Sequence, residues 1–454
     1  MKKRVLVSLL LAAALLLSGC SLVVKDQKVD NARVIVQVND ETVNKETFMQ
    51  YYNAALENQK MMEQLYRNYG MQVPAVSQED TLNQTVRATV RRLVLEQKAK
   101  ELGLDILSDE EKKSAEDKAQ VQYDGQLSSI QKQFFAGTQL EGDALKAALK
   151  EKADELGLDL ELLKDEARKT AVLEKVRQDA IKDVTVTAEE IQKEFDTRVE
   201  NDKKKFTEDA NAYGKALNGG NTVYYAPAGY RMVKQVLIKF TADDQKAIGD
   251  ARNALTPLTQ TVTKAESALD ENGKALAKEG LSADELQKLT DQKGELQKAL
   301  DEAKAKEQVA QQNLTAALEK GYAAIAQKAQ DVYTKAQGDE NFDELIKTFN
   351  EDPGQPEQGY AVREGFSDFD EAFVKPAMAL AEKGSVAEPS KGQYGYYIVQ
   401  YADDVAEGAV SLSSVSDTIK GDLLKKRQNE TFEKTVQQWI DAAKVETFAD
   451  RVKD

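Results

Sequence analysis

Few segments of this chain have the composition of a β-strand, and this scarcity limits what the chain can fold into. The clearest is QYGYYIVQY at residues 393–401, where aromatic and β-branched residues surround a Gly. YRMVKQVLIKF at 230–240 and VIVQV at 34–38 are of the same kind. Most of the remaining sequence has the spacing of helices. We therefore predict an α+β fold that is mainly helical, with small sheets.

Helix boundaries are marked by capping residues. Residues 79–102 carry an apolar stripe at helical spacing that ends before Gly103. Asn44 can cap the helix that follows it. Three capping boxes predict further helix starts: Ser108-x-x-Glu111, Thr187-x-x-Glu190 and Ser282-x-x-Glu285. Residues 412–443 read as a final helix whose apolar face needs a partner surface.

The first twenty residues read as an export signal. Lys2, Lys3 and Arg4 precede an apolar run that is too short to span a membrane comfortably. Leu17-Ser18-Gly19-Cys20 then resembles the lipobox of bacterial lipoproteins, which implies removal of residues 1–19, lipidation of Cys20 and a tether over 20–30. The alternative is an ordinary secretory signal that happens to contain a Cys.

Composition excludes several functional classes. The chain has no His, so a Ser-His-Asp triad, a Cys-His pair and a His-ligated metal are ruled out. Its single Cys permits no disulfide within the chain. The formal net charge of −16 argues against nucleic acid as a partner. We expect no metal and no cofactor.

Three phrases in the N-terminal half resemble one family. They are VIVQVNDETVNKETFMQYYN, LVLEQKAKELGLDILSDEE and VTVTAEEIQKEF, in this order over residues 30–210. They resemble the N-terminal chaperone domain of the SurA and PrsA family of extracytoplasmic folding factors. The resemblance implies a membrane-anchored foldase whose partners are unfolded or proline-containing exported polypeptides.

The same resemblance implies a parvulin-type prolyl isomerase domain, and residues 230–240 and 342–401 resemble its pieces. The closing strand 393–401 should then pair with the strand at 230–240. The implied domains are a helical chaperone domain, a parvulin-like domain and a C-terminal helix that returns to the chaperone domain. Their predicted bounds are 31–225, 226–405 and 406–454.

The resemblance also places the candidate site. The parvulin pattern has a His in each of the two strands, and here these positions hold Gln235 and Tyr397. The third polar position of the family matches Asp352, which we expect to act in the pocket and to contribute little to the core. The proline-binding positions of the family match three apolar residues. These are Phe369, Phe373 and Met378.

Two alternatives for the activity stay open. Prolyl isomerisation breaks no covalent bond and needs no general base, so Gln235, Asp352 and Tyr397 could sustain weak catalysis through hydrogen bonds. The domain could equally bind without catalysis. A rival function is an adaptor or structural lipoprotein that uses the same fold to hold one fixed partner.

An insertion of about eighty residues, 243–320, separates the first parvulin-like strand from the first helix. Its leucine spacing predicts an antiparallel helical hairpin that turns between Gly273 and Ser282. Pro257 is expected to bend or shorten the first arm. The hairpin is either a solvated spacer or an arm that touches clients or a partner.

Overall fold

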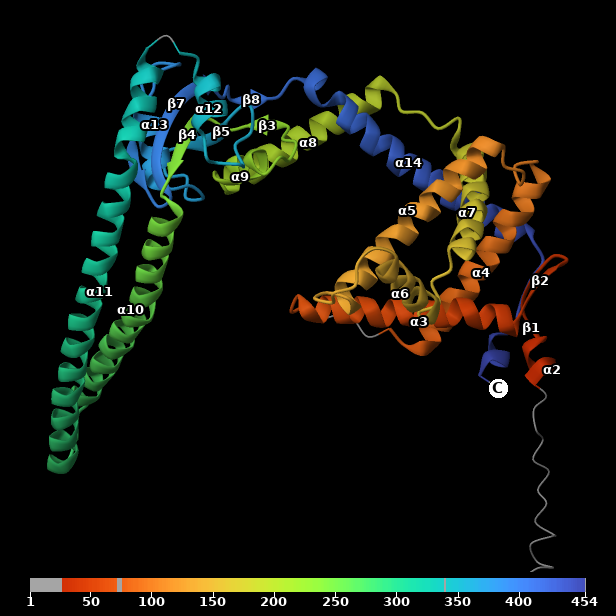
Figure 1. Cartoon of the computed structure of the whole chain (residues 1–454), viewed down its shortest axis with the longest axis horizontal. Helices are drawn as coiled ribbons and strands as arrows, with labels where there is room; N and C mark the ends of the chain where they lie inside the picture. The colour runs from red at the N-terminus through yellow and green to blue at the C-terminus, as the bar shows by residue number, and fades with distance from the viewer. Residues whose placement is uncertain (1–26, 72–75, 339, 454) are drawn as a thin grey trace, which may run out of the picture. The chain divides into compact units, whose positions relative to one another are not determined.

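The computed structural model describes residues 27–71, 76–338 and 340–453, and it divides into two compact units (Figure 1). Unit 1 comprises Met1–Val186 and Gly421–Asp454, and unit 2 comprises Thr187–Lys420. The predicted export signal and the lipidation site at Cys20 lie outside the described residues. The fold is α+β and mainly helical, which confirms the predicted class.

Unit 1 joins the first and last parts of the described chain through a small sheet. Its strand order is β2-β1-β9, and both neighbours of β1 are antiparallel to it. The elements of unit 1 are α2 (Gln27–Asn31), β1 (Val34–Val38), β2 (Glu41–Asn44), α3 (Lys45–Asn68), α4 (Gln78–Glu101), α5 (Asp109–Phe134), α6 (Gly142–Glu155), α7 (Leu160–Ile181), the part of α14 (Leu412–Ala442) that starts at Gly421, β9 (Val445–Thr447) and η1 (Ala449–Val452).

The core of unit 1 explains why these distant segments meet. Ile35, Val36 and Phe48 pack with the apolar stripe of α4, and Trp439 and Ile440 of α14 pack against this cluster. The apolar face of the last helix is thereby covered. The predicted cap of α3 at Asn44 and the predicted capping box at Ser108 are confirmed by their hydrogen bonds.

Unit 2 is built on a four-stranded antiparallel sheet of order β5-β4-β7-β6. Its elements are α8 (Ala188–Glu208), α9 (Ala212–Asn218), β3 (Tyr225–Ala226), β4 (Tyr230–Lys239), α10 (Ala242–Leu276), α11 (Ala283–Gln337), α12 (Phe342–Phe349), β5 (Tyr360–Arg363), α13 (Glu371–Ala379), β6 (Ser390–Gly392), β7 (Gly395–Asp404), β8 (Gly408–Ala409) and the part of α14 that ends at Lys420. The predicted pairing of the two long strands is confirmed, with Leu237 opposite Tyr397.

The boundary between the units differs from the predicted one at residue 225. It falls at Val186/Thr187, because α8 and α9 pack with the sheet of unit 2. Phe206 and Tyr213 from these helices share a cluster with Tyr230 and Ala361 from β4 and β5. The charged sequence of α8 gave few apolar positions from which this packing could be predicted.

The insertion forms two long helices, α10 and α11, that lie side by side (Figure 1). The first ends near Gly273, and the second begins at the predicted capping box of Ser282. The second arm does not stop at residue 320 but continues to Gln337 as one helix. Pro257 lies inside α10 without shortening it, because packing on α11 before and after it offsets the lost helical hydrogen bond.

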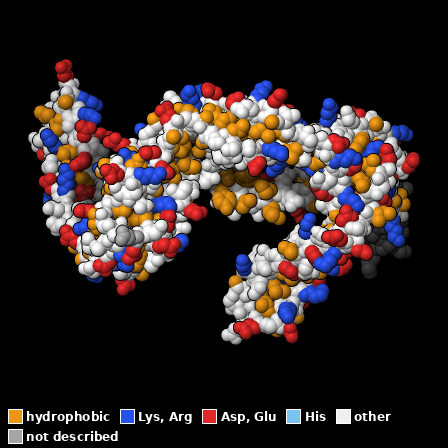
Figure 2. Space-filling view, turned by 90° about the horizontal axis from the view of Figure 1, so that it is seen from above, with side chains coloured by type: hydrophobic (Ala, Val, Ile, Leu, Met, Phe, Trp, Pro, Cys, Tyr) orange, Lys and Arg blue, Asp and Glu red, His pale blue; other side chains and the backbone are white. Residues whose placement is uncertain are grey.

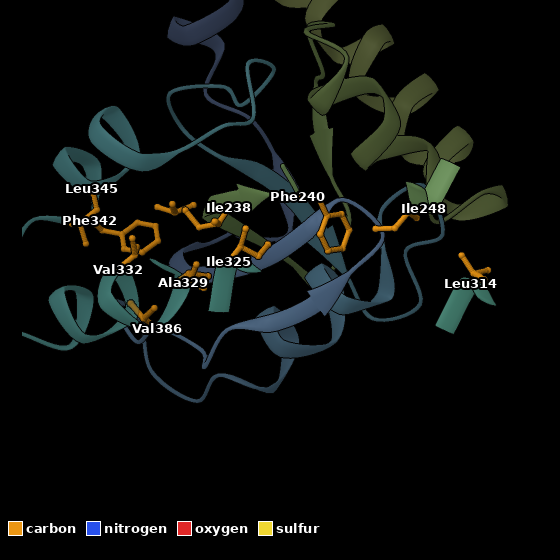
Figure 3. Close-up of a cluster of buried hydrophobic side chains, with 12 residues drawn as sticks. Ile238, Phe240, Ile248, Leu314, Ile325, Ala329, Val332, Phe342, Leu345 and Val386 are labelled. Carbon is orange, nitrogen blue, oxygen red and sulfur yellow. The ribbon is translucent and has the colours of Figure 1, made fainter. Parts of the chain in front are cut away.

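The continuation of α11 covers one face of the sheet. Figure 3 shows Ile325, Ala329 and Val332 of α11 together with Ile238 of β4 and Phe240, which follows β4 directly. Ile248 of α10 and two residues of α12, Phe342 and Leu345, also belong to this cluster. The base of the hairpin is therefore part of the core of unit 2.

The surface carries both charge signs. Figure 2 shows acidic and basic side chains interspersed on the visible face, with hydrophobic side chains between them. Within the described ranges, no helix is long and apolar enough to cross a membrane, and no cluster of acidic, His or Cys side chains could hold a metal ion.

Candidate functional site

The two central strands of unit 2 place the predicted polar residues on one face of the sheet. Leu237 and Tyr397 are directly opposite each other in the register, and Gln235 is opposite Val399. Residues two apart in a strand point to the same face. Gln235 and Tyr397 are therefore diagonal neighbours on this face, as the parvulin-like pattern predicts.

The acidic turn after α12 is attached to the edge of β4 beyond the end of β5. The backbone N–H of Leu237 donates to the Asn350 side-chain oxygen at 2.9 Å, and the N–H of Glu351 donates to the Leu237 carbonyl at 3.0 Å. The N–H of Gln235 donates to the side chain of Gln355 at 2.9 Å. These bonds occupy a strand edge that would otherwise be free, and they fix Asp352 beside Gln235.

Asp352 is the centre of a hydrogen-bond network. Its Oδ2 accepts from Gln235 Nε2 at 2.7 Å and from the Tyr360 hydroxyl at 2.9 Å, and its Oδ1 accepts from the Gly354 N–H at 3.0 Å. Burial, followed by this hydrogen bond and the Asp352 charge, raises the pKa of Tyr360 well above its usual range. Tyr360 therefore stays protonated and acts as a donor to Asp352.

The remaining oxygen of Gln235 has no partner. The residue is only 5% exposed, and its Oε1 is buried without a hydrogen bond to any described residue. A buried acceptor without a donor costs about 1–3 kcal/mol. A buried polar atom of this kind beside a cavity is available to a ligand.

Aromatic rings form the apolar wall of the site. The ring of Phe373 lies 5.5 Å from Phe369, 6.0 Å from Tyr360 and 5.9 Å from Tyr397, measured between centroids. Together with the polar residues these rings surround a cavity of about 290 Å³. Its lining residues are Gln235, Leu237, Asp352, Tyr360, Asp368, Phe369, Asp370, Phe373, Gln393, Tyr394 and Tyr397.

Tyr397 is held in the wall by close packing. Burial, with a smaller contribution from the Asp370 carboxylate, raises the pKa of Tyr397 well above its usual range. Its ring packs so closely against Gly392 that a Cβ there would overlap it. Within the described chain, its hydroxyl has no hydrogen bond. The neutral hydroxyl is therefore free to donate to a ligand in the cavity.

The structure brings five of the six predicted site residues of this domain together, and Met378 is the exception. Met378 packs on the cluster beneath α13 and does not line the cavity. It lies near the C-terminal end of α13, whereas Phe373 lies near the start of that helix. Its predicted place in the pocket wall stays a prediction.

Six lining residues were missed by the sequence interpretation: Leu237, Tyr360, Asp368, Asp370, Gln393 and Tyr394. Asp370 caps α13 by accepting from the Ala372 N–H at 3.0 Å, and it also accepts from the Gln393 N–H at 2.6 Å. An Asp directly before an apolar helix is a recognisable cap signal, which could have identified Asp370. Leu237 and Tyr360 are placed by strand register, and Asp368, Gln393 and Tyr394 by the segments between elements, neither of which the sequence reveals.

A second surface with exposed apolar side chains lies in unit 1, on α3. The helices α3 and α4 have 24 residues each, yet α4 buries residues along its whole length and α3 buries only Lys45 and Phe48. The far half of α3 and the residues after it expose large apolar side chains. These are Met61, Met62, Leu65, Tyr66, Tyr69, Met71 and Val76. We call this set the α3 patch.

Comparison with known proteins agrees with the geometry of unit 2. Residues 304–403 match the family model of the PPIC-type PPIase domain, described as rotamase. The resemblance predicted from the sequence is confirmed. The matched PPIase segment begins inside α11, so it includes part of the predicted insertion and excludes β4, which α10 and α11 separate from it in sequence.

Similar proteins are PrsA foldases. The foldase protein PrsA of Clostridium botulinum strain Hall is 29% identical over 124 residues, which are 27% of this chain and 37% of the relative. PrsA of Clostridium tetani is 28% identical over 125 residues, covering 27% of this chain and 36% of that protein. The match thus spans little more than a third of the length of these relatives.

Comparison with solved structures finds a SurA-like chaperone and PrsA proteins. A SurA-like chaperone of Campylobacter jejuni covers 71% of this chain and 94% of its own, with 15% identity and a TM-score of 0.23. PrsA from Bacillus subtilis covers 90% of this chain and 93% of its own, with 16% identity and a TM-score of 0.21.

Proposed function

We propose that this protein is an extracytoplasmic foldase that binds unfolded exported polypeptides and weakly isomerises their prolyl bonds in the cavity of unit 2. One observation carries the proposal. The cavity keeps an aromatic wall and an Asp352-centred network although both parvulin His positions hold other residues. The PrsA relatives are named foldases, which supports the same conclusion.

Prolyl isomerisation requires few catalytic groups from the site. The barrier to prolyl isomerisation comes from the partial double bond of the amide, so a site that favours the twisted amide accelerates the reaction. A thousandfold acceleration corresponds to about 4 kcal/mol. Phe369 and Phe373 offer apolar surroundings to the proline ring. The free hydroxyl of Tyr397 can donate a hydrogen bond to the twisted amide, whose nitrogen has regained its lone pair.

A magnetisation-exchange measurement on a proline peptide tests catalysis without a coupling protease. The soluble chain from residue 27 should raise the cis–trans exchange rate above the uncatalysed one. Tyr397→Phe should lower the acceleration by about tenfold, the loss of a hydrogen bond worth about 1.4 kcal/mol, while peptide affinity changes little. Phe373→Ala should weaken peptide binding itself, because it removes apolar wall.

The second candidate function is binding without catalysis, as in an adaptor that holds one fixed partner. The observation in its favour is the replacement of both parvulin histidines by Gln235 and Tyr397. In that case the wild type binds proline peptides without accelerating exchange, and Tyr397→Phe changes nothing. A Gln235→His/Tyr397→His variant helps to distinguish the two functions. If the domain is an intact parvulin scaffold that lacks only the hydrogen-bond network of the two histidines, this variant should gain isomerase activity.

Client binding is assigned to the α3 patch. Methionine side chains are flexible and polarisable, and they adapt to different apolar partners. Large exposed apolar patches mark interaction sites. A Leu65→Gln/Tyr69→Gln variant should suppress aggregation of several unrelated unfolded proteins less well than the wild type. Leu162→Gln on α7, which removes another exposed apolar side chain, is the matched control.

Membrane anchoring through Cys20 completes the proposal. The support is the sequence Leu17-Ser18-Gly19-Cys20 alone. Two or more acyl chains would hold the protein stably on a membrane. Mass spectrometry of the mature protein should find a lipidated N-terminal Cys20, and Cys20→Ala should prevent the modification. An unmodified thiol at Cys20 in the mature wild type would contradict this part.

A further inference from the structure

The charged residues that line the cavity in unit 2 are all acidic. Three of its lining residues are acidic, namely Asp352, Asp368 and Asp370, and none of the described lining residues is Lys or Arg. The donors that Asp352 accepts from at Gln235 and that Asp370 accepts from at Gln393 are neutral amides. Three acidic residues in the lining of one small cavity raise the local concentration of cations.

Two basic side chains, those of Lys215 and Arg252, lie close to the cavity but do not line it. Lys215 of α9 is 3.4 Å from Asp368, and both side chains are partly exposed to solvent. Arg252 of α10 donates to the backbone carbonyl of Gln393 at 3.3 Å. An exposed ion pair such as Lys215–Asp368 is weak and can be exchanged for another partner. The negative charges of Asp352 and Asp370 have no cationic partner in the described chain.

The unpartnered atoms of the cavity point to the same ligand chemistry. Gln235 is 95% buried, and its Oε1 can only accept a hydrogen bond. The hydroxyl of Tyr397 is neutral and without a partner within the described residues. A ligand therefore meets mainly acceptors and negative charge, and it has to bring donors.

We infer that the cavity selects prolyl peptides in which a Lys or Arg flanks the proline. The inference rests on the proposed proline-binding function and adds its specificity. The proline ring lies against Phe369 and Phe373, and the flanking cation reaches the Asp368–Asp370 rim. Acidic or phosphorylated residues beside the proline are disfavoured by the same charges.

A binding series on the soluble chain from residue 27 tests this inference. The probes are Ala-Lys-Pro-Phe, Ala-Leu-Pro-Phe and Ala-Glu-Pro-Phe, with a second set that carries Lys, Leu or Glu after the proline, and the affinities come from calorimetry. In at least one set, the Lys peptide should bind about three- to tenfold more tightly than the Leu peptide, with the Glu peptide weakest. The preference should shrink between about 0.02 M and about 0.5 M salt.

Charge-removing variants locate the effect. Asp370→Asn and Asp368→Asn should each reduce the ratio of Lys to Leu affinity, and Asn keeps the helix cap of α13. Glu371→Gln is the matched control, because it removes one negative charge next in sequence to Asp370 outside the cavity lining. That control should leave the ratio unchanged.

The outcomes separate this inference from the proposed function. Binding of all peptides with equal affinity in both sets would overturn the charge selectivity and leave proline binding intact. A Lys preference that Glu371→Gln lowers as much as Asp368→Asn would also overturn it, since the net charge of the chain would then explain the effect. Binding of none of the peptides would overturn both. If Asp370→Asn fails to fold, Asp368→Asn and the salt dependence of the wild type decide.

Discussion

The two faces of the sheet in unit 2 are built from the same strands and differ in kind. On one face Val236, Ile238 and Ile398 are fully buried beneath α11 and α12. On the other face Gln235 and Tyr397 stand among apolar neighbours, and α13 leaves a cavity above them. Since successive strand residues alternate between faces, one strand pair supplies both a closed apolar core and an open polar site. Stability and binding can therefore be altered separately.

The largest effect is expected on the closed face. Ile238→Ala should lower the free energy of unfolding by about 2–5 kcal/mol, because it leaves a cavity in a fully packed cluster. Urea denaturation followed by circular dichroism measures this change. The peptide affinity of the folded protein should stay within about twofold of the wild type, a difference of less than 0.5 kcal/mol. A much larger loss of affinity would show that the two faces do not act separately.

A smaller loss of stability is expected from the open face. Asp352→Ala should lower the free energy of unfolding by about 1–3 kcal/mol, because Gln235 Nε2 and the Tyr360 hydroxyl lose their shared acceptor. This differs from the expectation that a turn residue contributes little to the core. Asp368→Ala is the control, since Asp368 lines the same cavity without such a network, and it should change stability by no more than about 0.5 kcal/mol.

The contrast between the faces also shows what the sequence could reveal. The pairing of the strands at 230–240 and 393–401 was predictable, and so was the meeting of Gln235, Asp352 and Tyr397. Both predictions rest on a family pattern that is still recognisable on either side of the long insertion. The position of Met378 was not predictable, because its side-chain direction depends on how α13 lies over the sheet. The boundary at residue 186 depends on packing of α8 and α9 that a charged sequence hides.

A hydrogen bond from α11 links the helix layer on the closed face to the rim of the cavity, and it tests whether the two faces act separately. Tyr322 of α11 donates its hydroxyl to the Gly392 carbonyl at 2.8 Å, just before Gln393 and Tyr394 on the rim. Tyr322→Phe should cost about 0.5–1.5 kcal/mol of stability. It should also weaken peptide binding by up to about threefold, or 0.65 kcal/mol, because the rim loses one of its supports.

Tyr333→Phe on the same helix is the matched control for Tyr322→Phe. Tyr333 packs against the same cluster, and its hydroxyl makes no hydrogen bond within the described chain. Its replacement should leave both stability and affinity close to those of the wild type. Equal effects of the two variants would show that the contact with Gly392 does not support the rim.

The smallest expected effect is that of pH near neutrality. A parvulin with histidines at the two strand positions carries groups that titrate near pH 6.5, whereas this chain has no His. Burial raises the pKa of Tyr397 and of Tyr360 above 10, so both phenols stay protonated at neutral pH. Peptide affinity and exchange rate should therefore be flat between about pH 6 and about pH 8. The same shifts affect stability only in strong alkali, where the unfolded chain loses phenol protons that the folded chain keeps, so the free energy of unfolding should fall as the pH rises above about 10. A measured inflection near neutral pH would require a titrating group that the cavity does not contain, and it would count against the site described for the open face.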